Sequence, residues 1–193
     1  YMGLGEVGVG VIPAGGGCKE MMVRMTEGIP AGAIAGGLNL QQFYAKAFEN
    51  IGTAKVATSA MEAMELGFIR KNEGISLNRD QQLWDAKQVV LGLAKFYKKP
   101  RPAMIPVMGE NFRGMAEAIL FNMQHGKFAT EYDIHVGKKV AYILSGGDCA
   151  EGTLVSEQEI LDLEKEAFLS LCGEKRSQDR IMHMLTTGKP LRN

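Results

Sequence analysis

Cysteine is scarce in this chain, and neither sign of charge is in excess. The three cysteines, Cys18, Cys149 and Cys172, are too scattered for a zinc knuckle and odd in number for a disulfide framework, so we expect reduced thiols. Lysine and arginine together number 22, as do aspartate and glutamate, and basic residues gather only within 98–101. This balance argues against a nucleic-acid-binding surface.

Long apolar runs and clusters of metal ligands are lacking as well. Glycine, lysine or glutamate breaks each apolar stretch well short of a membrane span, and no charged-then-apolar leader opens the chain. His125, His135 and His183 lie in separate predicted helices with no Glu or Cys at ligand spacing, so we predict no metal site. We expect a cytoplasmic protein with no membrane span, whose apolar share of 46% is ample for a core.

The first twenty residues carry the most distinctive pattern. Glycines at positions 3, 5, 8 and 10 alternate with apolar residues, and Glu6 is the single acid in this run. Burial raises the pKa of a carboxyl group toward the range where it exchanges protons near neutrality, so Glu6 is a candidate catalytic acid. The alternative is a solvated Glu6 on the wet side of an edge strand.

A glycine turn at 15–17 follows Pro13 and precedes a predicted helix. Backbone N–H groups at the start of a helix suit an anion or a carbonyl oxygen, although such a turn can also be only a flexible helix entry. The sequence after the turn, Cys18-Lys19-Glu20, lacks the spacing of a P-loop. The full dinucleotide-binding fingerprint is absent too.

The combination of these features is more specific than its parts. Glu6, followed by Ile12-Pro13 and the glycines at 15–17, resembles the crotonase superfamily, which includes the enoyl-CoA hydratases and isomerases. Residues 54–69, above all the stretch from Ser59 to Ile69, resemble the short helix that closes the core of that family. Residues 184–192 resemble the closing helix and tail of the hydratase part of bacterial bifunctional 3-hydroxyacyl-CoA dehydrogenase/enoyl-CoA hydratases. No family motif matches 101–152.

The resemblance implies a mainly α fragment, the C-terminal half of a crotonase-like α/β fold with one or two short strands and about seven helices. Residues 1–78 would belong to the core and carry part of the active site. Residues 79–193 would form a helical region that packs on the core or makes oligomer contacts. The N-terminal part of the enzyme, with its oxyanion hole and the dehydrogenase part, would be missing, so the fragment alone is expected to be inactive.

The same resemblance implies an enoyl-CoA hydratase of fatty-acid β-oxidation, a lyase that adds water to an acyl-CoA thioester. Glu6 would hold the water and exchange a proton, and Ile12, Pro13, Gly15 and Gly16 would bind the acyl end of the substrate. No cofactor is expected in this chain, and NAD is expected only for the missing dehydrogenase part. The alternatives are an isomerase, in which Glu6 moves a proton between C2 and C4, and a noncatalytic helical module that binds the dehydrogenase half or another copy.

Apolar periodicity and capping residues predict most of the helices. Ser59 and Ser156 each begin a capping-box pattern, and Gly67 closes the short helix after Ser59. In the helix that Pro100 follows, Trp84 is expected to pack, the alternative being stacking on a ligand. The lysines of this segment and Arg101 either face solvent or meet the phosphates of coenzyme A. We expect a strand up to Ile12, a second at 68–70, a loop at 26–37, and helices at 18–25, 40–50, 60–67, 80–96, 110–125, 131–144, 156–171 and 175–185.

Overall fold

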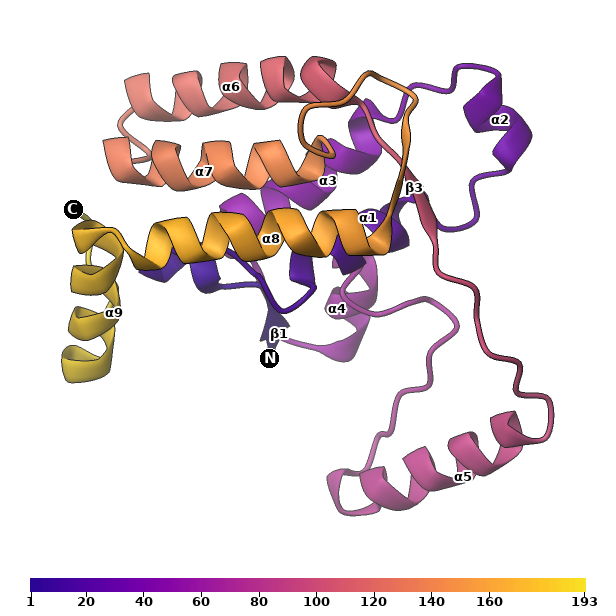
Figure 1. Cartoon of the computed structure of the whole chain (residues 1–193). Coiled ribbons are helices and arrows are strands. Elements are labelled where there is room, and N and C mark those ends of the chain that lie inside the picture. The colour runs from indigo at the N-terminus through magenta and orange to yellow at the C-terminus, as the bar shows by residue number, and fades with distance from the viewer.

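The computed structural model describes residues 1–193 and is mainly helical (Figure 1). The first part of the chain contains β1 (Met2–Gly3), the 3-10 helix η1 (Glu6–Val9), α1 (Gly17–Thr26), α2 (Ala31–Ala35), α3 (Gln41–Gly52), β2 (Val56–Ala57) and α4 (Ala60–Leu66). The second contains the 3-10 helix η2 (Arg79–Gln81), α5 (Gln82–Ala94), β3 (Met104–Pro106), α6 (Gly109–His125), α7 (Glu131–Leu144), β4 (Leu154–Ser156), α8 (Glu157–Cys172) and α9 (Lys175–Thr187). The expectation of a mainly α chain is confirmed, with nine α-helices rather than about seven.

One hydrophobic core joins the two parts of the chain. Helices α1, α3 and α7 meet at its centre, and α6 and α8 flank α7, running roughly alongside it in Figure 1. The cluster of 31 buried apolar residues extends from Val11 to Leu171 and so draws on both sides of residue 78. The division into 1–78 and 79–193 stays a prediction, as does a crotonase-like origin of the fold.

The strands are short and make two separate antiparallel pairs. β1 pairs with β2, and β3 pairs with β4 with Ile105 opposite Val155. Ile105 and Val155 are both buried, and the burial of these two side chains fixes the register in which β3 and β4 pair. None of the helices combines the length and apolar character that crossing a bilayer requires.

Most predicted helices are confirmed within two residues at each end, because their apolar spacing and their caps agree. Both halves of the capping box at Ser156 and Glu159 are present. At Ser59 only one half forms: its hydroxyl accepts from the Glu62 N–H at 3.1 Å, while the Glu62 carboxylate accepts from the Thr58 N–H at 2.7 Å.

Two expected strands and one expected loop are wrong. The strand that was to reach Ile12 ends at Gly3, and the chain then winds into η1, which Gly10 closes with a φ of 81° that favours glycine. Residues 68–70 form no strand, because the Phe68 and Ile69 amides donate back to the Ala63 carbonyl at the end of α4. The loop at 26–37 contains α2, a helix of 5 residues.

The packing expected for Trp84 is also wrong in this structure. Trp84 lies on α5, which stands apart from the other helices on two extended connections (Figure 1). Its side chain is 62% exposed. The sequence predicted the extent of α5, but not that the chain itself would leave this helix uncovered.

Candidate functional site

The glycine turn before α1 binds a carboxylate from the protein itself. The Gly16 N–H donates to Glu164 Oε2 at 2.9 Å, and the Lys19 N–H donates to Glu164 Oε1 at 2.7 Å. Glu164 lies on α8 and is fully buried. The anion position predicted from the glycines therefore exists, and an internal side chain fills it.

Burial is the main influence on Glu164. It raises the pKa of this carboxyl group, although the amides of Lys19 and Gly16 and the charge of the Lys19 ammonium act in the opposite direction. The Lys19 ammonium itself is paired with the carboxylates of Glu20 and Glu157, the latter at 2.9 Å. Burial acts to lower the pKa of Lys19, but these two carboxylates raise it on balance. The start of α1 is thus a closed network with no free cation.

Glu6 lies in η1 beside this network. Its side chain is half-buried, and its Oε2 atom is buried without a hydrogen-bond partner. The Cys18 thiol, which is fully buried, lies close enough to Glu164 and Glu6 to sense both charges: burial raises its pKa most, and the two carboxylates raise it further. Glu6 and Glu164 therefore both act on the electrostatic environment of Cys18.

The other predicted site residues are divided between core and surface. Ile12 and Pro13 are buried, and Ile12 belongs to the hydrophobic core. Gly16 is buried against Glu164, whereas Gly15 is exposed. Their roles in substrate binding, and that of Glu6 in catalysis, stay predictions.

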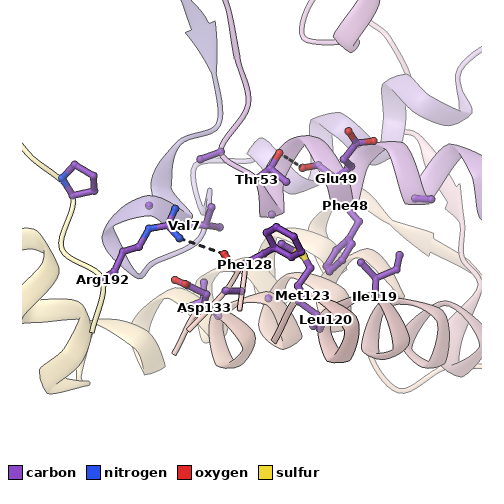
Figure 2. A pocket seen from close by; sticks show the side chains of 18 of the residues that line it. Val7, Phe48, Glu49, Thr53, Ile119, Leu120, Met123, Phe128, Asp133 and Arg192 are labelled. Atoms are coloured by element: carbon purple, nitrogen blue, oxygen red, sulfur yellow. Dashed lines mark hydrogen bonds between the residues drawn. The ribbon is translucent and has the colours of Figure 1, made fainter. Parts of the chain in front are cut away.

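A cavity lies elsewhere, between η1, α3, α6, α7 and the C-terminal tail (Figure 2). Its volume is about 690 Å³, and 11 of its 22 lining residues are hydrophobic. Phe48, Ile119, Leu120, Met123 and Phe128 form its apolar wall in Figure 2. None of the five predicted site residues lines it, although Val7 and Gly8, the neighbours of Glu6, do.

Arg180 anchors the tail at one end of this cavity. It is 1% exposed, and its guanidinium donates to Asp133 Oδ1 at 2.6 Å and to Asn193 Oδ1 at 2.7 Å. Burial acts to raise the pKa of Asp133, but the Thr130 amide and the Arg180 charge hold it below its usual value. The charge of Arg180 is therefore neutralised within the protein.

Two further cations border the cavity. Lys46 lines it from α3 and makes no ion pair. Arg192 reaches it from the tail, where its guanidinium donates to the Phe128 carbonyl oxygen at 3.3 Å (Figure 2). An apolar cavity with cationic groups at its edge suits a ligand that combines an apolar chain with an anionic group.

Sequence reasoning missed both Glu164 and the cavity. Glu164 could have been found, because Ile160, Glu164, Ala167 and Leu171 share one helical face and its other three members are apolar. The cavity gave no comparable signal, since its walls come from segments that are far apart in the sequence. No three His, Cys, Asp or Glu side chains are grouped in a way that could hold a metal ion.

Comparison with known proteins overturns the expected enzyme class. No family model and no solved structure matches the chain. A probable 3-hydroxyacyl-CoA dehydrogenase of Bacillus subtilis (strain 168) is 41% identical over 196 residues. That relative is an oxidoreductase by name and no hydratase appears among the matches, so the assignment as an enoyl-CoA hydratase, a lyase, is wrong. All of this chain aligns, yet it spans only 24% of the length of the dehydrogenase that it resembles.

Proposed function

We propose that this chain is part of a 3-hydroxyacyl-CoA dehydrogenase of fatty-acid metabolism and that its cavity receives the acyl chain of the thioester. The observation that carries the proposal is the 41% identity to such a dehydrogenase over the whole chain. The cavity adds physical support, because its volume of about 690 Å³ is within the range of small-molecule sites.

The apolar wall suits an acyl chain. Phe48, Ile119 and Phe128 present hydrocarbon surface, and each methylene group of a ligand that leaves water there contributes roughly 0.8 kcal/mol. Met123 adds an unbranched side chain that adapts to chains of different length. Affinity should therefore increase with acyl length until the cavity is full.

The cationic edge suits the other end of the same substrate. Coenzyme A carries several phosphate charges, and both lysine and arginine bind phosphate. Lys46 has no carboxylate partner to displace, and Arg192 would give up only its bond to the Phe128 carbonyl. We assign the contact with the coenzyme A phosphates to these two residues.

Binding of the nicotinamide cofactor is assigned to another part of the longer dehydrogenase. The glycine turn here does not fit a pyrophosphate, because Glu164 occupies the Gly16 and Lys19 amides at 2.9 and 2.7 Å. An anionic ligand at that position would meet a buried carboxylate rather than free N–H groups. Accordingly, no step of hydride transfer is assigned to residues of this chain.

The test is calorimetric titration of the 193-residue chain with 3-hydroxydecanoyl-CoA and with free coenzyme A. We expect the acyl-CoA to bind at least about tenfold more tightly than free coenzyme A, since its chain buries several methylene groups. Ile119→Trp, which fills the cavity, should abolish this difference. Leu169→Trp, at an exposed position on α8, is the matched control and should retain it. Equal affinity for both ligands in the unchanged chain would contradict the proposal.

A further inference from the structure

Phe128 lines the cavity and also faces water. It is 74% exposed, whereas Phe48, the other aromatic ring that lines the cavity, is 4% exposed. Phe128 therefore belongs both to the apolar wall and to the protein surface, so it lies at the mouth of the cavity. An apolar ligand that enters the cavity would remove this ring from water, which is favourable.

The backbone fixes where this ring lies. The Phe128 N–H donates to the Met123 carbonyl oxygen at 2.9 Å, and the Lys127 N–H donates to the Gln124 carbonyl oxygen at 3.0 Å. These two bonds form the turn that ends α6. They bring residue 128 back beside the last turn of the helix instead of leading it onward into solvent.

Lys127 has an unfavourable backbone conformation in this turn. Its φ is 59°, and it is one of two non-glycine residues in the chain with a positive φ. Glycine is the usual residue at such a helix end, because a Cβ atom crowds the backbone there. The other residue, Ala54 with a φ of 51°, lines the same cavity. Strained residues of this kind cluster at ligand-binding sites.

A glycine is present one residue earlier, where the ring requires it. Gly126 has a φ of −73°, which any residue adopts, so its backbone conformation does not need glycine. A Cβ atom at Gly126 would lie 2.7 and 2.8 Å from two carbon atoms of the Phe128 ring. These distances are too short for packed carbon atoms, so the ring would have to move. The absence of a side chain at 126 thus allows the ring to lie against the end of α6.

The ring stands between the cationic edge of the cavity and the rest of the apolar wall. In Figure 2 it lies between Arg192 on one side and Phe48 and Ile119 on the other. Arg192 also donates to the Phe128 carbonyl oxygen at 3.3 Å, so it is anchored to the same turn. A ligand with its anionic end at Arg192 and its apolar end at Phe48 must pass the ring.

We propose that Phe128 is the specificity-determining residue of this cavity, and that its ring covers an acyl chain long enough to extend past it toward Phe48 and Ile119. The inference rests on the proposed function and names the part of the substrate that the site selects. Hydrocarbon suits the ring better than the pantetheine arm of coenzyme A, whose amide groups would lose their bonds to water there. A four-carbon acyl chain leaves most of the apolar wall uncovered and gains little from the ring.

The first experiment is calorimetric titration of the unchanged chain and of Phe128→Ala with 3-hydroxydecanoyl-CoA and with 3-hydroxybutanoyl-CoA. Phe128→Ala should weaken binding of the ten-carbon ligand about tenfold or more and that of the four-carbon ligand less than about twofold, because only the longer chain loses the ring. Phe128→Leu, which keeps apolar surface, should restore most of the loss. Circular dichroism should show that both variants keep their helix content. Equal weakening of both ligands, or no weakening of either, would overturn the proposal.

The second experiment displaces the ring without removing it. Gly126→Ala should reduce the preference for the ten-carbon over the four-carbon ligand about threefold or more, because the new Cβ atom pushes the Phe128 ring from its position. Gly114→Ala is the matched control, since Gly114 is exposed on α6 and a Cβ atom there meets nothing within 4 Å. It should leave the preference unchanged. The same preference in both variants would contradict the role of the ring.

The third experiment gives a readout other than affinity. The double variant Phe128→Trp/Trp84→Phe moves the single tryptophan of the chain to the mouth of the cavity. Its fluorescence emission should shift to shorter wavelength on saturation with 3-hydroxydecanoyl-CoA, because the ring then leaves water, and should not shift with 3-hydroxybutanoyl-CoA. An identical shift with both ligands would mean that the ring does not distinguish acyl chains.

Failure of this proposal is distinguishable from failure of the proposed function. If the unchanged chain prefers acyl-CoA over free coenzyme A and Phe128→Ala retains the full preference for the ten-carbon ligand, only the role of Phe128 is wrong. If the unchanged chain binds acyl-CoA and free coenzyme A equally, the acyl-binding cavity and the role of Phe128 are both wrong.

Discussion

At the scale of single residues, Glu164 has the largest structural role. It connects the start of α1 to the middle of α8 by accepting two backbone N–H groups, and it does so from a fully buried position. A buried carboxyl group is stable only when its oxygens are bonded, and the two amides supply those bonds. Glu164 is thus a structural acid, in contrast to the catalytic acid that the sequence predicted at Glu6.

The pKa of Glu164 predicts how stability depends on pH. Because burial raises this pKa in the folded protein, the folded state binds more protons than the unfolded state between the ordinary glutamate range and the raised value. The contribution of Glu164 to the free energy of unfolding is therefore largest at low pH and declines as pH rises through that window. Urea denaturation at several pH values should show that the unchanged chain loses stability relative to Glu164→Gln on going up in pH.

Both proteins contain the groups that affect stability in the opposite direction, such as Asp133, whose pKa is lowered. The contributions of these groups cancel when the unchanged chain is compared with Glu164→Gln. A Glu157→Gln variant should show the opposite trend, because the pKa of Glu157 is lowered by the Lys19 ammonium and the Ala103 amide. If the free energy of unfolding of the unchanged chain increased with pH relative to that of Glu164→Gln, the raised pKa assigned to Glu164 would be contradicted.

At the scale of elements, capping residues and apolar periodicity were sufficient to predict where the helices lie. They were not sufficient to predict what packs around each helix. The start of α8 could be predicted, because Ser156 and Glu159 satisfy each other's backbone within one turn. The strand expected up to Ile12 failed because alternating glycines allow a 3-10 helix as readily as an extended chain. The packing of Trp84 failed because periodicity shows which face of a helix is apolar, and not what covers it.

The two capping patterns allow a matched test. Ser156→Ala removes a hydroxyl that accepts from the Glu159 N–H and also donates to Glu159 Oε2 at 2.8 Å, and it should lower the free energy of unfolding by about 1 kcal/mol. Ser59→Ala removes only the hydroxyl that accepts from Glu62, while Glu62 keeps its bonds to Thr58, so the loss should be smaller. Urea denaturation of both variants gives the comparison, and equal losses would mean that the bond from the Ser156 hydroxyl to the Glu159 carboxylate contributes nothing.

At the scale of the whole molecule, the C-terminal tail closes one end of a cavity that is lined mainly by the helices. Arg180 donates a hydrogen bond to the Asn193 side chain, and Arg192, the residue before Asn193, lines the cavity. This arrangement could not be predicted from the sequence, because Arg180 and Asp133 are 47 residues apart and no motif links them. The resemblance identified a 3-hydroxyacyl-CoA dehydrogenase among the related proteins, as the match to such a dehydrogenase bears out, but the hydratase activity that it implied is wrong.

Removal of the Arg180 charge should therefore destabilise the protein. Arg180→Met leaves the Asp133 carboxylate without its partner, and breaking a buried ion pair costs about 3 kcal/mol. Arg176→Met is the control, because Arg176 also lies over the Tyr132 ring but is half-exposed and pairs with Glu131 at 3.5 Å. Its loss should be below about 1 kcal/mol. Thermal and urea denaturation of both variants measures the two losses. A loss for Arg176→Met as large as that for Arg180→Met would contradict the prediction.

The bond between Gly16 and Glu164 also has a consequence for the order of folding. It joins residues 148 positions apart, and the Ser177 hydroxyl donates to the Gly10 carbonyl across 167 positions. During synthesis, at roughly 5 to 20 residues per second, Gly10 and Gly16 emerge well before their partners on α8 and α9. These glycines can therefore form their long-range bonds only after the 148 and 167 residues that separate the partners have been made.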